Sequence, residues 1–184
     1  MGRWGIRQSI AGIQEAMLAT RSINTVPLAP DNLDRAIGLG ALLLLAAILT
    51  ALFRGRAGWE AVPPAVWAHL FCAILAVMLT PVMLWRRRGD TKHRALGYIW
   101  VGAMTATAGF SLWIRQINAG HFSLIHILSI GTLLVLPQVV WSARTHNIAL
   151  HRRTIRGMAI GALLVAGAFT FTPPRILGHW LFGG

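Results

Sequence analysis

Residues 85–97 read W-R-R-R-G-D-T-K-H-R-A-L-G, a basic stretch that joins two long apolar segments. Residues 144–157 read R-T-H-N-I-A-L-H-R-R-T-I-R-G, and they are also basic and also lie between apolar segments. Each stretch carries a His-Arg pair at the start of the apolar segment that follows. Two turns of one kind predict two helical hairpins, and the rest of the chain is interpreted outward from them.

The composition is typical of an integral membrane protein. Of the 184 residues, 55% are hydrophobic and only 12% are charged. The formal net charge is +12, but Lys and Arg are concentrated in short turns beside apolar runs. We therefore expect a lipid bilayer with anionic headgroups as the partner, and not nucleic acid. The single cysteine, Cys72, excludes an intrachain disulfide, and the absence of a C-x-x-C-H motif excludes covalent haem attachment.

The apolar pattern predicts an all-α membrane protein with five transmembrane helices, since one crossing takes about 20 residues. The last four helices, within residues 63–172, are expected to form an antiparallel four-helix bundle of two repeated hairpins. Asp31 or Asn32 is predicted to cap the first span and Thr91 the third. The first span has almost no polar side chains, so we expect it to face lipid or to serve in packing. The predicted spans are Leu33–Phe53, Pro64–Trp85, Thr91–Ile117, Phe122–Trp141 and Ile148–Thr172.

The two ends of the chain are predicted to be amphipathic. Ile6, Ile10, Ile13 and Met17 recur at helical spacing among basic and amide side chains. Residues 1–32 are therefore interpreted as a segment lying in the membrane interface, with a short helix docked on the bundle as the alternative. Residues 173–184 are expected to form a short tail.

The distribution of Lys and Arg predicts the orientation in the membrane. Both basic turns and the segment before the first span carry more of these residues than the connections on the other side. By the positive-inside rule, the N-terminus and both turns lie in the cytoplasm, and the C-terminus lies in the periplasm. The expected location is the bacterial inner membrane.

Four histidines recur at matching depths in the two predicted hairpins. His69 and His93 are 24 residues apart, and His126 and His151 are 25 residues apart. If the hairpins pack as a bundle, His69 faces His126 near the outer side, and His93 faces His151 near the cytoplasm. Two such pairs suit up to two haem b groups, each held between facing helices. The alternative for His93 and His151 is that both face lipid headgroups.

Basic side chains flank the inner pair of histidines and are candidates for binding haem propionates. They are Lys92, Arg94, Arg152 and Arg153.

The histidine motifs also carry a resemblance. His69, His93-Arg94-x-x-Gly97, Ile125-His126-x-Leu128-Ser129, His151-Arg152 and the run A-G-A-F-T at residues 166–170 resemble a family of uncharacterised bacterial membrane proteins over residues 63–184. More coarsely, ligands that alternate over four successive helices resemble those of transmembrane dihaem cytochromes b. This resemblance implies an outer haem on His69 and His126 and an inner haem on His93 and His151.

The acidic residues exclude several classes of membrane protein. None of the five carboxylates is expected deep in a span, which argues against a di-iron oxygenase, a carboxylate proton relay and most ion-coupled transporters. They are Glu15, Asp31, Asp34, Glu60 and Asp90. Three functional hypotheses remain. The first hypothesis is a small membrane cytochrome b-like electron-transfer protein that works with a quinone or a partner protein. The second is a cofactor-free accessory or scaffold subunit of a larger membrane complex. The third is a small transporter or metal-handling protein that uses the same histidines.

Overall fold

All elements of the described part of the chain are helical. The computed structural model describes residues 12–14, 29–86, 89–114, 124–173 and 175–183. The long helices are α2 (Asn32–Arg54), α3 (Pro64–Trp85), α4 (Thr91–Trp113) and α5 (Leu124–Arg144). The shorter elements are the 3-10 helix η1 (Arg56–Ala61), α6 (Ile148–Met158), the π-helical segment η3 (Ala159–Val165), α7 (Ala166–Phe169) and α8 (Ile176–Phe182).

Four of these helices, α2 to α5, are long and apolar enough to cross a membrane. The prediction is confirmed at that level: the described residues form an all-helical structure with several helices that could cross a membrane. The predicted N-terminal amphipathic helix lies outside the described residues, apart from residues 12–14, which are helical and exposed.

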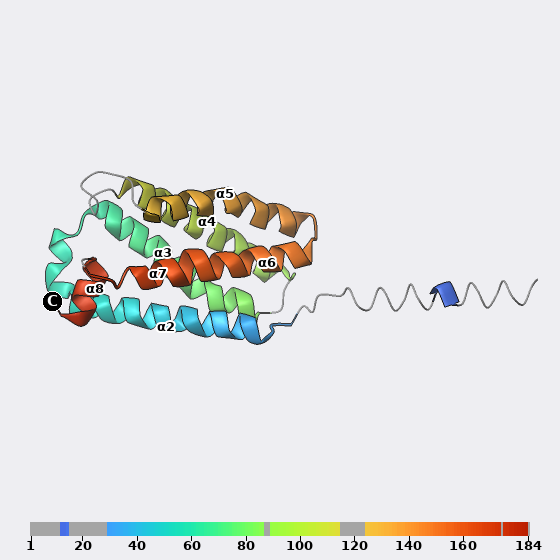
Figure 1. Cartoon of the computed structure of the whole chain (residues 1–184), viewed down its shortest axis with the longest axis horizontal. Coiled ribbons are helices and arrows are strands. Elements are labelled where there is room, and N and C mark those ends of the chain that lie inside the picture. The colour runs from blue at the N-terminus through green and yellow to red at the C-terminus, as the bar shows by residue number, and fades with distance from the viewer. Residues whose placement is uncertain (1–11, 15–28, 87–88, 115–123, 174, 184) are drawn as a thin grey trace, which may run out of the picture.

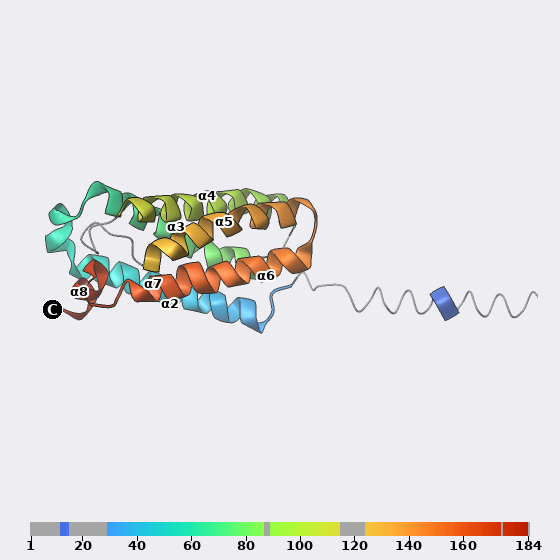
Figure 2. The ribbon, with the colours of Figure 1, turned by 45° about the horizontal axis from the view of Figure 1, so that its top comes forward.

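The long helices lie side by side and alternate in direction (Figures 1 and 2). Helix α3 packs against α2 and α4, and α5 packs against α4 and α6. The start of α2, the α3–α4 turn and the α5–α6 turn therefore meet at one end, which we name the basic end. The opposite end holds η1, the end of α4 and α8, and α8 contacts α2 there.

Most helix boundaries lie close to the predicted ones, but α4 ends at Trp113 and not at Ile117, α5 ends at Arg144 and not at Trp141, and one predicted cap differs. Helix α3 begins and ends where predicted, and Asp31 caps α2 in a capping box with Asp34. The predicted cap of α4, Thr91, is wrong: Asp90 is the N-cap, and its carboxylate accepts a hydrogen bond from the backbone N–H of His93 at 2.6 Å. Both residue types suit the position, and the carboxylate one residue earlier reaches the free N–H groups of the first turn.

The last predicted span is one continuous rod made of three helical segments. Helices α6 and α7 join through η3 without a break, and the helical run ends at Phe169, three residues before the predicted end. A π-helical stretch inside a helix widens the turn and shifts the register of the side chains that follow. Apolar patterning does not predict such a change, because a π-helical stretch and an α-helical stretch need not differ in composition.

Helix α2 is a packing helix as well as an apolar one. Gly38 admits the indole of Trp85 from α3, and a Cβ at Gly167 of α7 would lie 2.6 Å from Leu44. The buried residues of α2 recur at helical spacing and form one face of the helix. They are Asp34, Ile37, Gly38, Ala41, Leu44, Ile48 and Ala51. The expected packing role is therefore observed for this face, while Leu39 and Leu43 on other faces are exposed.

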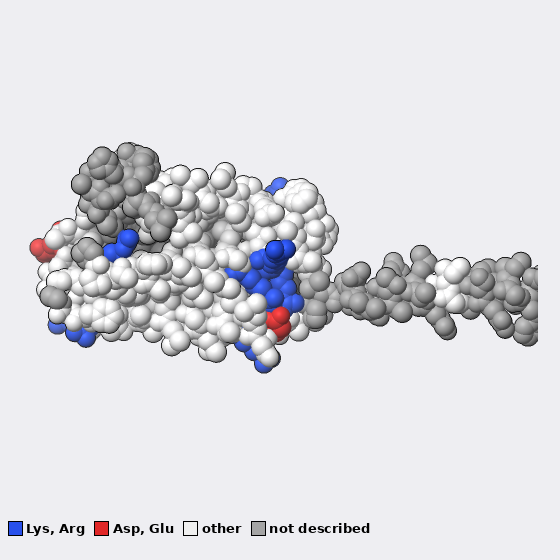
Figure 3. Space-filling view, viewed as in Figure 1, with Lys and Arg blue, Asp and Glu red and all other residues white. Residues whose placement is uncertain are grey.

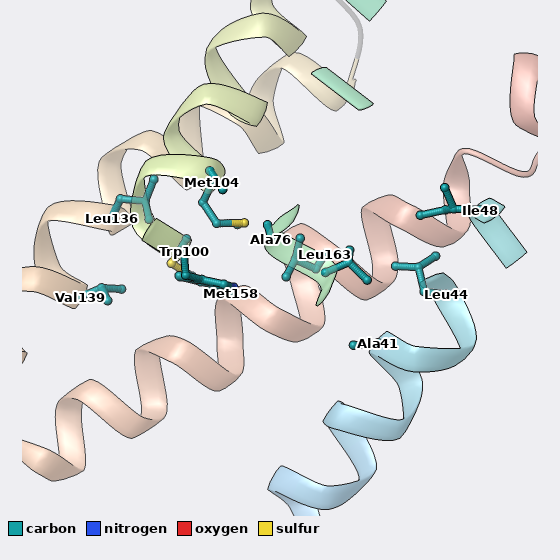
Figure 4. Packing of buried hydrophobic residues seen from close by; sticks show 12 residues of the cluster. Ala41, Leu44, Ile48, Ala76, Trp100, Met104, Leu136, Val139, Met158 and Leu163 are labelled. Atoms are coloured by element: carbon teal, nitrogen blue, oxygen red, sulfur yellow. The ribbon is translucent and has the colours of Figure 1, made fainter. Parts of the chain in front are cut away.

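The larger apolar cluster of the interior combines buried side chains from α2, α3, α4, α5, α6 and η3. Figure 4 shows Ala41, Leu44 and Ile48 of α2 among side chains from the other helices. Trp100 of α4 is 3% exposed, and its Nε1–H donates to Thr80 Oγ1 on α3 at 3.0 Å. A buried indole N–H thus has a polar partner inside the core, as burial of such a group requires.

The outer surface differs sharply between its long sides and its ends. Large apolar side chains such as Leu43, Phe71 and Leu134 are about seven-tenths exposed. On the face shown in Figure 3, Lys and Arg gather toward the ends of the helical body, and the long side between them is uncharged. Apolar exposure of this extent marks a surface that faces lipid or another protein.

Replacing Gly38 by Ala tests the α2–α3 contact. The new Cβ would overlap the indole of Trp85, whose Nε1–H donates to the backbone carbonyl of Asp34 at 3.2 Å. We expect Gly38→Ala to lower the free energy of unfolding by about 1–3 kcal/mol, through overpacking and the lost hydrogen bond. Unfolding of the purified protein in detergent provides the measurement. Gly102→Ala is the matched control, because nothing lies within 4 Å of a Cβ there; equal losses in both variants would contradict this packing.

Candidate functional site

A cavity of about 360 Å³ opens at the basic end between α3, α4, α5 and the rod that begins with α6. Its deeper wall is apolar and includes Leu84, Trp100, Val139 and Ala159. Its volume is in the range of pockets that hold small-molecule ligands and cofactors. Its polar side chains are Thr80, His93, Arg94, Tyr98, Arg144, His146, His151 and Arg152.

The cavity brings together two of the four predicted histidines. His93 is the third residue of α4 and His151 is the fourth of α6, and both line the same space. They are 58 positions apart in the sequence. The two histidines come together because α4 and α6 both begin at the basic end. The sequence of either turn alone does not show that they share a cavity.

The hydrogen bonds of His151 indicate which ring nitrogen carries the proton. Its Nδ1 lies 3.1 Å from the carbonyl oxygen of Val139 and 3.4 Å from Ser142 Oγ. A carbonyl only accepts, so Nδ1–H donates to Val139, and in the neutral ring Nε2 is the lone-pair nitrogen. Histidines that bind metals are commonly oriented in this way, with the second nitrogen donating to a backbone carbonyl.

His69 shows the same local arrangement nearer the opposite end. Its Nδ1 lies 2.9 Å from the carbonyl oxygen of Thr107 on α4, which again leaves Nε2 as the lone-pair nitrogen. His126, the other predicted member of this pair, is 2% exposed on α5. Neither residue lines the cavity at the basic end, and the pairing of His69 with His126 stays a prediction. Within the described ranges, no group of three or more His, Cys, Asp or Glu side chains is placed to hold a metal ion.

The four predicted basic residues separate into two kinds. Arg94 and Arg152 line the cavity, whereas Lys92 and Arg153 are exposed and are not part of its lining. Arg144 was not among the predicted residues, yet it lines the cavity and its Nη2 donates to the Tyr98 hydroxyl at 3.4 Å. The sequence places Arg144 only three residues after the predicted end of the fourth span, at Trp141. A longer span would have indicated that Arg144 lies at the helix end beside the predicted histidines.

A buried ionic cluster lies beside the cavity and ties the first helix to the last. Asp34 is 0% exposed, and its carboxylate lies 2.9 Å from both Arg152 and Arg156. The two arginines also pair with Asp31, which is half-exposed. The sequence places Asp34 at the start of the first predicted span and not deep within it. Its partners are 118 and 122 positions away, so no local pattern connects them.

Two carboxyl groups outside the spans titrate below their ordinary range. The Arg86 guanidinium, at 2.8 Å, and the backbone N–H of His93 lower the pKa of Asp90 to about 2. The backbone N–H of Asp34 and the Arg156 side chain lower the pKa of Asp31. A depressed folded-state pKa contributes stability above the ordinary value of 3.8, and this contribution is lost as the pH falls toward the folded value. Both groups are therefore ionised near neutral pH.

The arrangement at the basic end suits an amphipathic anion. The cavity is apolar in its depth, has three histidines in its lining, including the predicted His93 and His151, and has arginines along its edge. No Asp or Glu is among its lining residues.

Comparison of this chain with protein-family models, curated proteins and solved structures found no match.

Asp34→Asn tests the ionic cluster. The substitution leaves Arg152 and Arg156, which are 10% and 19% exposed, without their buried counter-charge. Removing one partner of a buried pair costs roughly 3–5 kcal/mol, so we expect a loss of this size in the free energy of unfolding in detergent.

Two further variants separate the charge effect from a general packing defect. Asp31→Asn should lower stability less than Asp34→Asn, because Asp31 is 48% exposed. Asp34→Asn combined with Arg156→Gln should be more stable than the sum of the two single losses implies. Additive losses would show that Asp34 and Arg156 do not interact.

Proposed function

We propose that the protein is a small membrane cytochrome b-like electron-transfer protein that holds haem b in the cavity at the basic end, with His93 and His151 as the iron ligands. The observation that carries this proposal is that these two histidines, from two different helices, line one cavity. The predicted pairing of the inner histidines motivated the proposal, and the shared cavity supports it.

The residues around the cavity fit a haem group. The apolar wall suits a macrocycle, and the protonation of His151 at Nδ1 presents Nε2 as a ligand atom. The arginine side chains are suited to the carboxylates of the propionates. Haem b would supply one-electron oxidation and reduction. If His93 and His151 both bound the iron, the group would serve electron transfer and not substrate chemistry.

The proposal extends to a second site and to the membrane arrangement. His69 and His126 are proposed to hold an outer haem, which the orientation of His69 and the burial of His126 support. The rod from Ile148 to Phe169 contains 22 residues, or roughly 33 Å if helical throughout, which suffices for a fifth crossing. The two hairpins α3–α4 and α5–α6 would then form the four-helix core, with the basic end in the cytoplasm of a bacterial cell. The electron partner is proposed to be a quinone or a second protein.

The test is a dithionite-reduced minus oxidised absorption spectrum of the detergent-purified protein, measured together with the haem-to-protein ratio. Wild type is expected to show a b-type spectrum. His93→Ala and His151→Ala should each remove about one haem per chain, because each deletes one ligand of the same iron. His69→Ala should remove only the outer haem, and His179→Ala, on α8 at the opposite end, is the control that should change nothing.

Folding is followed separately by elution profile and melting temperature, so that loss of haem is not confused with loss of structure. A colourless wild-type protein that folds normally would reject the cytochrome and favour the cofactor-free accessory subunit. A haem that is insensitive to both His93→Ala and His151→Ala would reject the site at the basic end.

A further inference from the structure

Two guanidinium groups at the cavity remain available to an anion. Arg94 lies in the first turn of α4, and Arg144 is the last residue of α5. Among the described residues, the ion pairs involve Arg86, Arg152 and Arg156, and neither Arg94 nor Arg144 lies within 4 Å of a carboxylate oxygen. Arg152 differs from both, since Asp31 and Asp34 already balance its charge together with that of Arg156.

Arg94 and Arg144 lie along the same edge of the cavity. Tyr98 follows Arg94 by four residues, so the two side chains leave the same face of α4. Arg144 reaches across from α5 and donates to the Tyr98 hydroxyl at 3.4 Å. All three residues line the cavity, and Tyr98 is 56% exposed, which places this edge at the surface of the protein.

The edge of the cavity is positively charged and its deeper wall is apolar, so a matching ligand has an acidic group and an apolar body. Val139, Trp100 and Ala159 on the inner side offer only apolar contact, apart from the indole N–H of Trp100, which is bonded to Thr80. The edge offers two positive charges, and no carboxylate lines the cavity to balance them. A guanidinium binds carboxylate and phosphate oxygens through paired, charge-assisted hydrogen bonds.

We infer that Arg94 and Arg144 form a recognition site for the acidic group of an amphipathic ligand whose apolar body fills the cavity. For haem b, the acidic group is a propionate carboxylate, and in this form the inference rests on the proposed function. A phospholipid with a net negative headgroup presents the same chemistry through its phosphate. The site assigns anion recognition to Arg144 in place of Lys92 and Arg153, which lie outside the cavity lining.

The first experiment compares haem b with its dimethyl ester, in which both propionates are uncharged. The dissociation constant of each is measured by optical titration of haem-depleted protein in detergent. Wild type should bind the free acid about tenfold or more tightly than the ester, as expected for charge-assisted hydrogen bonds. Arg94→Gln with Arg144→Gln should abolish this preference and leave the affinity for the ester unchanged. Lys92→Gln with Arg153→Gln is the matched control, since it removes two charges from the same end and should keep the preference.

Three results are distinguishable in this comparison. A preference for the free acid that disappears only in the Arg94 and Arg144 variant supports the inference. A preference that persists in that variant, or that is absent in wild type, overturns it for haem. Failure of both forms to bind contradicts the proposed function, and the second experiment then decides the inference.

The second experiment uses phospholipid as the probe. The protein is exchanged into detergent with equal amounts of phosphatidylglycerol and phosphatidylcholine, and retained lipid is identified by native mass spectrometry. Wild type and the Lys92 and Arg153 control should retain phosphatidylglycerol over phosphatidylcholine by about tenfold. Loss of this ratio in the Arg94 and Arg144 variant supports recognition of the acidic headgroup. Equal ratios in all three proteins, after failure with haem, would overturn the inference.

Discussion

The buried carboxylate of Asp34 is the constraint on which the basic end depends. An ionised carboxylate removed from water is stable only when opposite charges and hydrogen bonds surround it. Arg152 and Arg156 supply both, from the same face of α6 one turn apart. The carboxylate therefore requires the start of α2 to lie against the start of the last helical rod. Asp34 lies in the first turn of α2, and both arginines lie in α6, the first part of the rod. The link therefore also fixes the position of α2 along the rod.

The same cluster shapes the cavity next to it. Arg152 belongs to both, and its charge is balanced by the two aspartates within the cluster. The positive character of the cavity is consequently concentrated at Arg94 and Arg144, on the edge formed by α4 and α5. Trp85 adds a second connection, because its indole fits over Gly38 and donates to the backbone carbonyl of Asp34. The first helix thus acts as a structural support for a site to which it contributes no lining residue.

The histidines show how far local patterns reach into the candidate site. The repeated His-Arg pairs indicated that His93 and His151 occupy equivalent places, and the alternating directions of successive helices bring both to one cavity. The same reasoning selected Lys92 and Arg153, whose side chains lie away from that cavity. Adjacent residues on a helix point about 100° apart, so neighbours of a site residue in the sequence commonly face elsewhere. Arg144 lies at the correct angle but beyond the predicted helix end.

The sequence by itself determined the helical class, the order of the apolar segments, most helix ends and the concentration of positive charge in two turns. These properties follow from residue composition and short-range periodicity, because a helix in an apolar environment satisfies its backbone hydrogen bonds within one segment. Only the tertiary structure decided that Asp34 pairs with Arg152 and Arg156, that α2 shares the core, and that Arg94 and Arg144 border one cavity. Each of these depends on the packing angle and depth of helices far apart in the chain. Many side chains set that geometry together, and no single segment encodes it.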